Sequence, residues 1–320
     1  MKIFHHNDLD GRCAAAIAWR YAENPRNLQN ITTIEVDYKD DLGPFIEKIL
    51  PDERVIIVDF SFCEKDMEMV LQKTGDIIWI DHHKSAIGRK YSVDLKGLRS
   101  NNYSGCELTW MYFCSNHPIP HAVELIGDMD TWKWIYGKET ERFCEGLKLC
   151  ILSSKKILSL SADSYVWDEV FKNINFVNDL IVKGIVAIEC RDRLSEDYRK
   201  SFGFEVVFEG YKTYVLGFVG YGSKVFGEKM NEYPLCMNFA YDGKKWQIGI
   251  YSNTLDVSEI AVRHGGGGHK GAGGWVTSKF PWGENEDKNS FSKLDSDIRA
   301  VIDWLNNGNT ADWLYEETKK

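Results

Sequence analysis

The sequence predicts an α/β protein with an N-terminal parallel sheet, a helical connector and a smaller mixed α/β domain. Three observations support this fold class. Apolar runs alternate with helical patterns over residues 1–150, which is typical of a parallel sheet with helices on both faces. Residues 151–200 are mainly helical, and residues 201–280 are rich in expected strands. The 320 residues suffice for two domains, and residues 281–320 form a C-terminal tail of unassigned role.

The expected elements of the N-terminal domain follow one another regularly. Apolar runs predict strands at Met1–Phe4, Ile31–Val36, Arg54–Val58 and Ile77–Ile80. Helical patterns lie at Arg12–Tyr21, at Phe45–Leu50 before Pro51, at Glu64–Lys73, and at Ser104–Phe113 with Ser104 as the helix cap. Runs that are apolar throughout fit strands buried on both faces of the sheet.

The second half begins with a long helical segment, Val177–Asp197, which is expected to connect the domains. Strands are then expected at Phe204–Phe208, Tyr214–Phe218, Leu235–Tyr241 and Trp246–Tyr251. This domain ends in the glycine-rich stretch His264–Gly274. Beyond it, Gly283–Ser290 is expected to be a polar linker and Leu294–Asn306 a short helix.

Composition excludes several classes of protein. Hydrophobic residues make up 43% and charged residues 27% of the chain, so it is neither disordered nor fibrous. No apolar run approaches the roughly 18–20 residues of a membrane span, and the start MKIFHHNDLDG lacks the apolar stretch of a signal peptide. The eight cysteines form no C-x-x-C pair, which favours reduced thiols in a cytoplasmic protein.

The net charge of −9 limits the ligands of the chain. Proteins that hold long nucleic acids by their backbone are usually basic. We therefore expect a phosphate-bearing ligand to be small, or to be held by metal ions and a few local cations. Neither long nucleic acid nor a membrane is an expected partner, and the sequence does not decide between a monomer and a homodimer.

Acidic side chains stand where the predicted strands end. Asp8 and Asp10 follow the first strand, Asp59 follows the third and Asp81 the fourth. The carboxyl ends of parallel strands line one crevice, which is the usual ligand site of such a sheet. Converging carboxylates repel one another unless cations lie between them. The placement of the acids therefore predicts a metal site.

Histidines beside these acids supply nitrogen ligands, namely His5, His6, His82 and His83. Mixed oxygen and imidazole ligation suits Mn²⁺, Co²⁺, Fe²⁺ or Zn²⁺ better than Ca²⁺. Some pieces also have a purely structural explanation, because Asp8 and Asp10 could belong to a turn that caps a helix and Asp59 could cap another. Adjacent histidines after a buried strand have no such explanation, so the pieces together favour the metal site.

In their order along the chain, these motifs resemble those of the DHH phosphoesterase family, in the branch with a C-terminal DHHA1 domain. The triplet that names the family stands as Asp81-His82-His83, the first motif as HNDLDG at residues 6–11, the second as Asp59 in VIIVDFS, and the glycine motif of the second domain as GGGH at residues 266–269. The resemblance covers residues 1 to about 280 and includes nanoRNase-type oligoribonucleases.

The resemblance implies two divalent metal ions per chain, expected to be Mn²⁺, with Co²⁺ or Mg²⁺ as alternatives. One ion is expected on His6, Asp8 and Asp59. The other is expected on Asp10, Asp59, His82 and the acid of the fourth motif, so that Asp59 bridges the two ions.

Two of these ligand positions have alternatives. Most family members place the first-motif histidine where this chain has Phe4, so His6 is the expected ligand and His5 the alternative. The fourth motif is LIGDMDTW, in which Asp128 follows an apolar run as a strand-end ligand should. Asp128 is therefore preferred to Asp130, which could instead brace the segment that follows.

The resemblance also implies roles for residues around the metals. His83 is expected to face the substrate as a hydrogen-bond donor or general acid, and Asp81 to orient the two histidines. Trp132 and Trp134 could stack a nucleobase or could pack in the core.

The glycine motif of the second domain is expected to bind a substrate phosphate through backbone N–H groups, although flexible linkers have similar sequences. The expected substrate-binding residues are Arg263, Gly266, Gly267, Gly268 and His269, although Arg263 could equally be a cation at a helix terminus. Together with the metal site, they imply two domains that face each other across a cleft.

The function expected from the resemblance is hydrolysis of very short oligoribonucleotides from the 3′ end to mononucleotides. The alternatives are a phosphatase of 3′-phosphoadenosine 5′-phosphate, a hydrolase of linear dinucleotides from cyclic-dinucleotide turnover, and a non-catalytic nucleotide-binding module. A dinucleotide-cofactor site is not expected, because no G-x-G-x-x-G follows the first strand.

Overall fold

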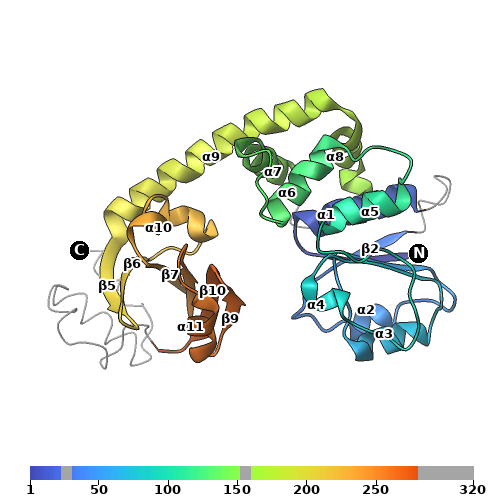
Figure 1. The fold of residues 1–320 in the computed structure, drawn as a ribbon, viewed down its shortest axis with the longest axis horizontal. Coiled ribbons are helices and arrows are strands. Elements are labelled where there is room, and N and C mark those ends of the chain that lie inside the picture. The colour runs from blue at the N-terminus through green and yellow to red at the C-terminus, as the bar shows by residue number, and fades with distance from the viewer. Residues whose placement is uncertain (23–30, 152–159, 280–320) are drawn as a thin grey trace, which may run out of the picture. The chain divides into compact units, whose positions relative to one another are not determined.

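The computed structural model of the chain describes residues 1–22, 31–151 and 160–279 (Figure 1). It divides into two compact units, Met1–Ile188 and Glu189–Lys320. Each unit contains its own sheet, so the predicted α/β class is confirmed. The expected linker Gly283–Ser290 and helix Leu294–Asn306 lie outside the described residues.

Unit 1 is built on a parallel sheet. Its strands are β1 (Lys2–His6), β2 (Thr32–Val36), β3 (Val55–Val58) and β4 (Ile77–Ile80). They lie in the order β2-β1-β3-β4, and each pair is parallel. His5 pairs with Val58 and Val58 with Ile80, so the residues that follow these three positions leave the sheet at the same edge.

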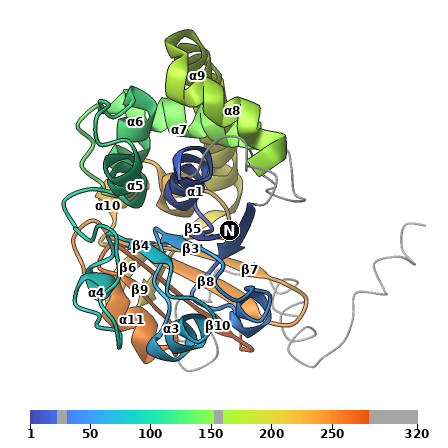
Figure 2. The same ribbon diagram turned by 90° about the vertical axis from the view of Figure 1, so that its right-hand side faces the viewer.

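Helices cover both faces of this sheet (Figure 2). Helices α1 (Leu9–Tyr21) and α5 (Gly105–Phe113) lie on one face, and α2 (Gly43–Ile46) and α3 (Glu64–Leu71) lie on the other. Alternate residues of β3 therefore enter different cores, with Ile56 and Val58 in the first and Val55 and Ile57 in the second. This explains why β3 is apolar throughout.

The remaining helices of unit 1 follow the sheet. They are α4 (Lys84–Ile87), α6 (His121–Asp130), α7 (Lys138–Ile151) and α8 (Leu160–Lys172), followed by the long α9 (Ile174–Phe202). Buried residues of α6, α7 and α8 extend the core that α1 and α5 form. The boundary between the two units lies within α9.

Unit 2 contains a mixed sheet in the order β5-β6-β7-β8-β10-β9. Its strands are β5 (Gly203–Phe208), β6 (Tyr211–Leu216), β7 (Leu235–Tyr241), β8 (Trp246–Tyr251), β9 (Gly267–His269) and β10 (Ala272–Thr277). Helix α11 (Val257–Arg263) packs on one face, whereas η2 (Gly222–Phe226) and α10 (Lys229–Glu232) pack on the other. Across the described part of both units, no helix has the length and apolar character needed to span a bilayer.

Candidate metal centre

His6 and Asp8 lie at the junction between β1 and α1. The Asp8 side chain caps α1, because its Oδ1 accepts a hydrogen bond from the Gly11 N–H at 2.8 Å. Its Oδ2 lies 2.5 Å from His6 Nδ1. Asp8 therefore caps the helix with one oxygen and faces the site with the other. Burial by itself raises the pKa of Asp8 and lowers the pKa of His6. The hydrogen bond between the two side chains acts in the opposite direction, and the pKa of Asp8 is lowered to about 2 while the pKa of His6 is raised.

Asp10 is a buried carboxylate held by the N-terminus of α5. Its two oxygens accept hydrogen bonds from the Gly105 N–H at 2.6 Å and the Cys106 N–H at 2.9 Å. A helix N-terminus carries partial positive charge, which stabilises this anion. Gly105 must be glycine, because a Cβ there would lie 2.5 Å from Asp59 Cβ. Helix α5 therefore approaches the site more closely than any side chain would allow.

Asp59 follows β3 and lies at the centre of the site. Its φ of +53° is in the left-handed region that non-glycine residues rarely adopt, and its N–H donates to the Ile80 carbonyl at 2.9 Å. The side chain is 1% exposed, and within the described residues neither carboxylate oxygen has a hydrogen-bond partner. Burial and the nearby Asp10 and Asp8 raise its pKa well above the ordinary value.

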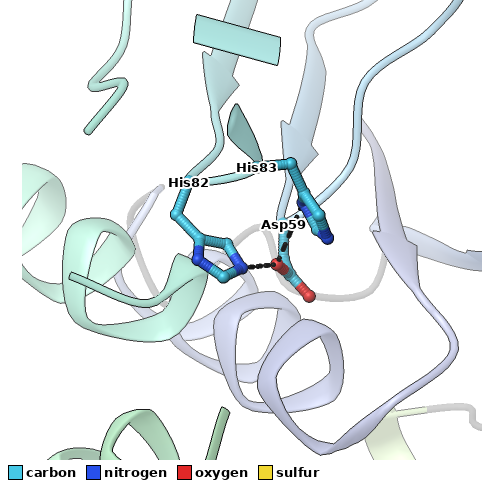
Figure 3. Close-up of side chains that lie close together, drawn as sticks. All are labelled: Asp59, His82 and His83. Atoms are coloured by element: carbon cyan, nitrogen blue, oxygen red, sulfur yellow. Dashed lines mark ion pairs between the residues drawn. The ribbon is translucent and has the colours of Figure 1, made fainter. Parts of the chain in front are cut away.

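His82 lies between three carboxylates. Its Nε2 is 3.1 Å from Asp59 Oδ1 (Figure 3), 3.3 Å from Asp130 Oδ2 and 3.7 Å from Asp10 Oδ2. Burial lowers the pKa of His82. Burial and the charge of Asp10 raise the pKa of Asp130 to about 9. Without a cation, Asp59 and Asp130 therefore favour protonation over sharing the site as anions.

Asp81 orients the histidine pair as expected from the sequence. Its Oδ1 accepts hydrogen bonds from the backbone N–H groups of His82 and His83, at 2.7 and 3.1 Å, and from His83 Nδ1 at 2.7 Å. Its Oδ2 accepts a hydrogen bond from the Ser61 hydroxyl. Although burial opposes it, the contact with Asp81 raises the pKa of His83. His83 Nδ1 also lies 3.9 Å from Asp59 Oδ1 (Figure 3).

The preference for Asp128 in the fourth motif is corrected by the structure. The apolar run before it belongs to helix α6, so Asp128 does not stand at the end of a strand. Its carboxylate accepts hydrogen bonds from the Ile135 N–H at 2.7 Å and from the Thr140 hydroxyl at 2.5 Å. Asp130, one half-turn further along α6, is the acid that lies beside His82.

The other histidine of the first motif lies apart from the donor sets. His5 is 1% exposed, and its Nδ1 contacts the His6 carbonyl oxygen at 2.8 Å. It belongs to none of the candidate metal-binding groups found among the described residues. His6 is therefore the first-motif histidine that the structure brings to the acids.

Among the residues that the structure describes, three side-chain groups have the composition and spacing to hold metal ions. They are His6, Asp8 and Asp59; Asp10, His82 and Asp130; and Asp59, His82 and His83, and the donor atoms within each group lie within 4.8 Å of one another. Buried polar atoms without partners are costly in a folded protein. In the described part of the chain such atoms include both oxygens of Asp59, His82 Nε2 and Asp130 Oδ2. These donors fit divalent cations, which would provide the missing partners.

In unit 2, the glycine motif forms part of a hairpin. Gly268, at φ +153°, pairs with Gly273 of β10, and a Cβ on Gly268 would lie 2.4 Å from the Ala272 carbonyl oxygen. Gly267, Gly268 and His269 are exposed. The Gly266 N–H donates to the Ala261 carbonyl at 2.8 Å, so it is not free for a phosphate as the sequence led us to expect.

Arg263 also differs from its expected role as a free cation. Its guanidinium forms an ion pair with Glu209, with Nε at 3.2 Å from Oε2. His264 shares this carboxylate through Nε2 at 2.8 Å and stacks on Trp275 with ring centroids 4.6 Å apart. Arg263 is therefore an ion-paired cation in the last turn of α11.

Some residues of the site were not predicted from the sequence. Ser61 and the Gly105 N–H bind site carboxylates, and Tyr38 lies against two site histidines, with its ring centroid 5.7 Å from His6 and 5.9 Å from His83. Ser61 follows Asp59 by two residues within the second motif, which is a weak signal. Gly105 follows the predicted helix cap, but its contact with Asp10 joins residues 95 positions apart.

Comparison with known proteins finds a family that is similar to the first part of the chain. Residues 1–127 match the DHH family, N-terminal domain. Over 305 residues the chain is 24% identical to the oligoribonuclease NrnB of Bacillus subtilis (strain 168), which covers 85% of this chain and 71% of that protein.

Solved structures of similar fold agree with this match. The pGpG-specific phosphodiesterase PggH from Vibrio cholerae is 13% identical, covers 96% of this chain and 99% of its own, and gives a TM-score of 0.51. The DHH domain of PF0399, a member of a family of ribosomal proteins, is 15% identical, covers 86% and 82%, and gives a TM-score of 0.57. At these identities the likeness concerns the fold. Residues 1–127 are therefore similar to the N-terminal domain of the DHH family, in sequence and in fold.

Proposed function

We propose that the protein is a metal-dependent phosphodiesterase that hydrolyses very short oligoribonucleotides from the 3′ end to mononucleotides. The similarity of residues 1–127 to the DHH family supports the coarser activity, hydrolysis of phosphoester bonds. The similarity to NrnB, an oligoribonuclease that aligns with most of this chain, favours short RNA as the substrate.

The buried carboxylate of Asp59, which has no hydrogen-bond partner within the described residues, carries this proposal. One of its oxygens lies on the side of His6, at 3.9 Å, and the other on the side of His82, at 3.1 Å. We assign one ion to His6, Asp8 and Asp59, and the other to Asp10, Asp59, His82 and Asp130. Two such ions, when bound, polarise a phosphoryl group and lower the pKa of a water molecule.

The remaining chemistry belongs to the chain itself. His83 Nδ1 donates to Asp81, which fixes the ring and leaves Nε2 free to give a proton to the leaving oxygen of the substrate. Asp81 in turn accepts a hydrogen bond from the Ser61 hydroxyl, and both residues are buried. This buried Ser61–Asp81 pair therefore fixes the orientation of His83. His83 is therefore our candidate general acid, and Asp81 a positioning residue.

The charge of the chain favours a short substrate. With a net charge of −9, a long polyanion gains little from the protein surface. In unit 2, Gly267, Gly268 and His269 of the glycine motif are exposed on β9, and they are our candidates for contact with a substrate phosphate. Their role in substrate binding remains a prediction.

Hydrolysis of 5′-labelled RNAs of two to twelve nucleotides, with Mn²⁺ as the metal, tests the proposal. We expect dinucleotides and trinucleotides to be converted to mononucleotides, with turnover falling as length increases. Turnover of 3′-phosphoadenosine 5′-phosphate alone would replace the proposal with a phosphatase. Tight Mn²⁺ binding without hydrolysis of any of these substrates would leave only a nucleotide-binding module.

A further inference from the structure

Two tryptophans, the exposed Trp132 and the half-buried Trp134, follow the metal centre directly in the chain. Trp132 is 71% exposed, so it does not pack in the core. Trp132 and Trp134 have φ values of +54° and +53°, in the left-handed region that is unfavourable for large side chains. Their rings contact each other at 5.5 Å with an interplanar angle of 74°. The chain therefore holds a large apolar surface in solvent at the cost of backbone strain.

The segment that carries these tryptophans is fixed on both sides. Before it, Asp130 contributes to the donor set at His82. After it, the buried Asp128 carboxylate binds the Ile135 N–H at 2.7 Å. Between the tryptophans, Lys133 Nζ donates to the Asn102 carbonyl at 2.6 Å. Because Trp132 is two residues from Asp130, their Cα atoms are at most about 7 Å apart, so the backbone that carries the indole lies close to the metal centre.

A second aromatic side chain lies at the other donor set. The Tyr38 ring stacks on Phe60 at 4.5 Å, lies tilted against the ring of His6 at 5.7 Å and meets the ring of His83 edge-on at 5.9 Å. Phe60 covers one face of the ring, yet Tyr38 remains 51% exposed. Tyr38 thus offers a free aromatic surface on the side of His6, whereas the tryptophans offer one on the side of Asp130.

We propose that these two aromatic surfaces, Tyr38 on one side and Trp132 with Trp134 on the other, each stack one base of a dinucleotide whose phosphodiester lies at Asp59. The inference rests on the proposed function and adds the means of substrate selection. Every base has a π-face, so stacking is tolerant of sequence. It also supplies affinity that a protein of net charge −9 does not gain from extra phosphates.

Substitutions to leucine test the two surfaces separately, because leucine keeps apolar bulk and removes the aromatic face. Trp132→Leu and Tyr38→Leu are compared with Tyr165→Leu, a matched control at a 67% exposed tyrosine on α8. The substrates are a dinucleotide and two analogues that lack the base on the 5′ or the 3′ side. Bound Mn²⁺ is measured in each variant, to show that the metal centre is intact.

On the full dinucleotide, we expect each of the two site variants to raise KM by about 5- to 100-fold, the effect of losing one stacked base, with kcat changed by less than about 2-fold. Each site variant should have the same KM as the wild type on the analogue that lacks the base it would stack. One of the two analogues should behave in this way with Trp132→Leu, and the other with Tyr38→Leu. Tyr38→Phe should retain the wild-type KM. Equal losses on all three substrates, or KM values like those of Tyr165→Leu, would overturn the inference.

Nucleotide binding without turnover separates this inference from the proposed function. AMP should quench the tryptophan fluorescence of the wild type, ribose 5-phosphate should not, and Trp132→Phe should reduce the quenching by AMP. Quenching by AMP in a protein that hydrolyses no phosphodiester would contradict the proposed function and retain the aromatic surfaces. Equal affinity for AMP and ribose 5-phosphate would reject base stacking even if dinucleotides are hydrolysed.

Discussion

Asp59 combines three features that are unfavourable in isolation. It has a left-handed backbone, it is buried, and it lies near the like charges of Asp8 and Asp10. Strain of this kind persists where the surrounding structure enforces it, and it gathers at functional sites. Here the Asp59 N–H is tied to the Ile80 carbonyl at the end of β4, so the backbone turns the carboxylate away from the sheet and toward His82.

The two acids of α6 should respond differently to substitution. Asp130→Asn should lower the content of bound Mn²⁺ and abolish hydrolysis, because it removes a ligand beside His82. Asp128→Asn should keep the metal but destabilise the fold by about 1–3 kcal/mol, since buried donors lose a charged acceptor. Elemental analysis and thermal unfolding check both variants. Loss of metal in Asp128→Asn with full metal in Asp130→Asn would restore the assignment made from the sequence.

A substitution at His83 distinguishes a role as general acid from a role as metal ligand. His83→Gln should keep bound Mn²⁺ and slow hydrolysis of a dinucleotide by roughly 10²–10⁴-fold, the usual effect of losing a positioned acid. Its KM should change little. Because His83 also lies in one of the candidate metal-binding groups, metal content is the decisive measurement. A variant with less metal would make His83 a ligand.

At the scale of elements, the site is assembled by strand ends and one helix N-terminus. Strands β1, β3 and β4 bring His6, Asp59 and Asp81 to one edge of the sheet, since their preceding residues are in register. Helix α5 then closes the site from one side through the amides that bind Asp10. The close approach of α5 depends on the missing side chain at position 105.

Gly105→Ala tests that approach. The added Cβ would lie 2.5 Å from Asp59 Cβ and 2.7 Å from Asp59 Oδ1, so α5 or the carboxylate must move. We expect a loss of about 1–3 kcal/mol in unfolding free energy together with reduced Mn²⁺ content. Gly75→Ala is the matched control, because nothing lies within 4 Å of a Cβ there. Unchanged metal binding in Gly105→Ala would show that the amides of α5 do not position Asp10.

The sequence predicted these elements unevenly. Ile77–Ile80, Leu235–Tyr241 and Trp246–Tyr251 were predicted with the bounds of β4, β7 and β8, because apolar runs bounded by turn residues define strands well. The segment Leu125–Gly127 was wrongly interpreted as a strand end. It is three residues of a buried helix face, and a run that short does not distinguish a helix from a strand.

The sequence predicted those parts of the candidate site that depend on residues directly after the strands. Acids and histidines that directly follow strands could be placed at one edge, because a parallel sheet fixes where they emerge. Contacts between segments that are distant in the sequence could not be predicted in this way. The amides of α5 at Asp10, Ser61 at Asp81 and Tyr38 beside His6 all depend on tertiary packing. The hydrogen bond from the Gly266 N–H to the Ala261 carbonyl and the Arg263–Glu209 ion pair could not be predicted for the same reason.

At the scale of the whole molecule, the question is whether unit 2 takes part in substrate binding. His269→Ala should strongly reduce hydrolysis of dinucleotides, because the exposed imidazole of β9 would no longer meet a substrate phosphate. Hydrolysis of bis-p-nitrophenyl phosphate should fall much less, since the metal ligands of unit 1 are unchanged. His117→Ala, at another exposed histidine, is the control. Equal losses on both substrates would contradict a role in substrate binding.

The length of the substrate depends on the whole chain as well. Each added nucleotide brings a phosphate to a protein of net charge −9, so affinity should stop rising after a few nucleotides. Efficient degradation of RNAs beyond about ten nucleotides would require a basic channel, which the overall charge of the chain disfavours.

The content of bound Mn²⁺ in the wild type and in Asp59→Asn, measured on the same preparations as dinucleotide hydrolysis, tests the central claim most directly. We predict two Mn²⁺ ions per chain and hydrolysis in the wild type, as a shared carboxylate between two ions requires. Asp59→Asn should lose metal and all hydrolysis while remaining folded, because the substitution relieves repulsion among the buried acids. An Asp59→Asn protein that keeps two ions, or a wild type that hydrolyses dinucleotides without bound metal, would contradict the account.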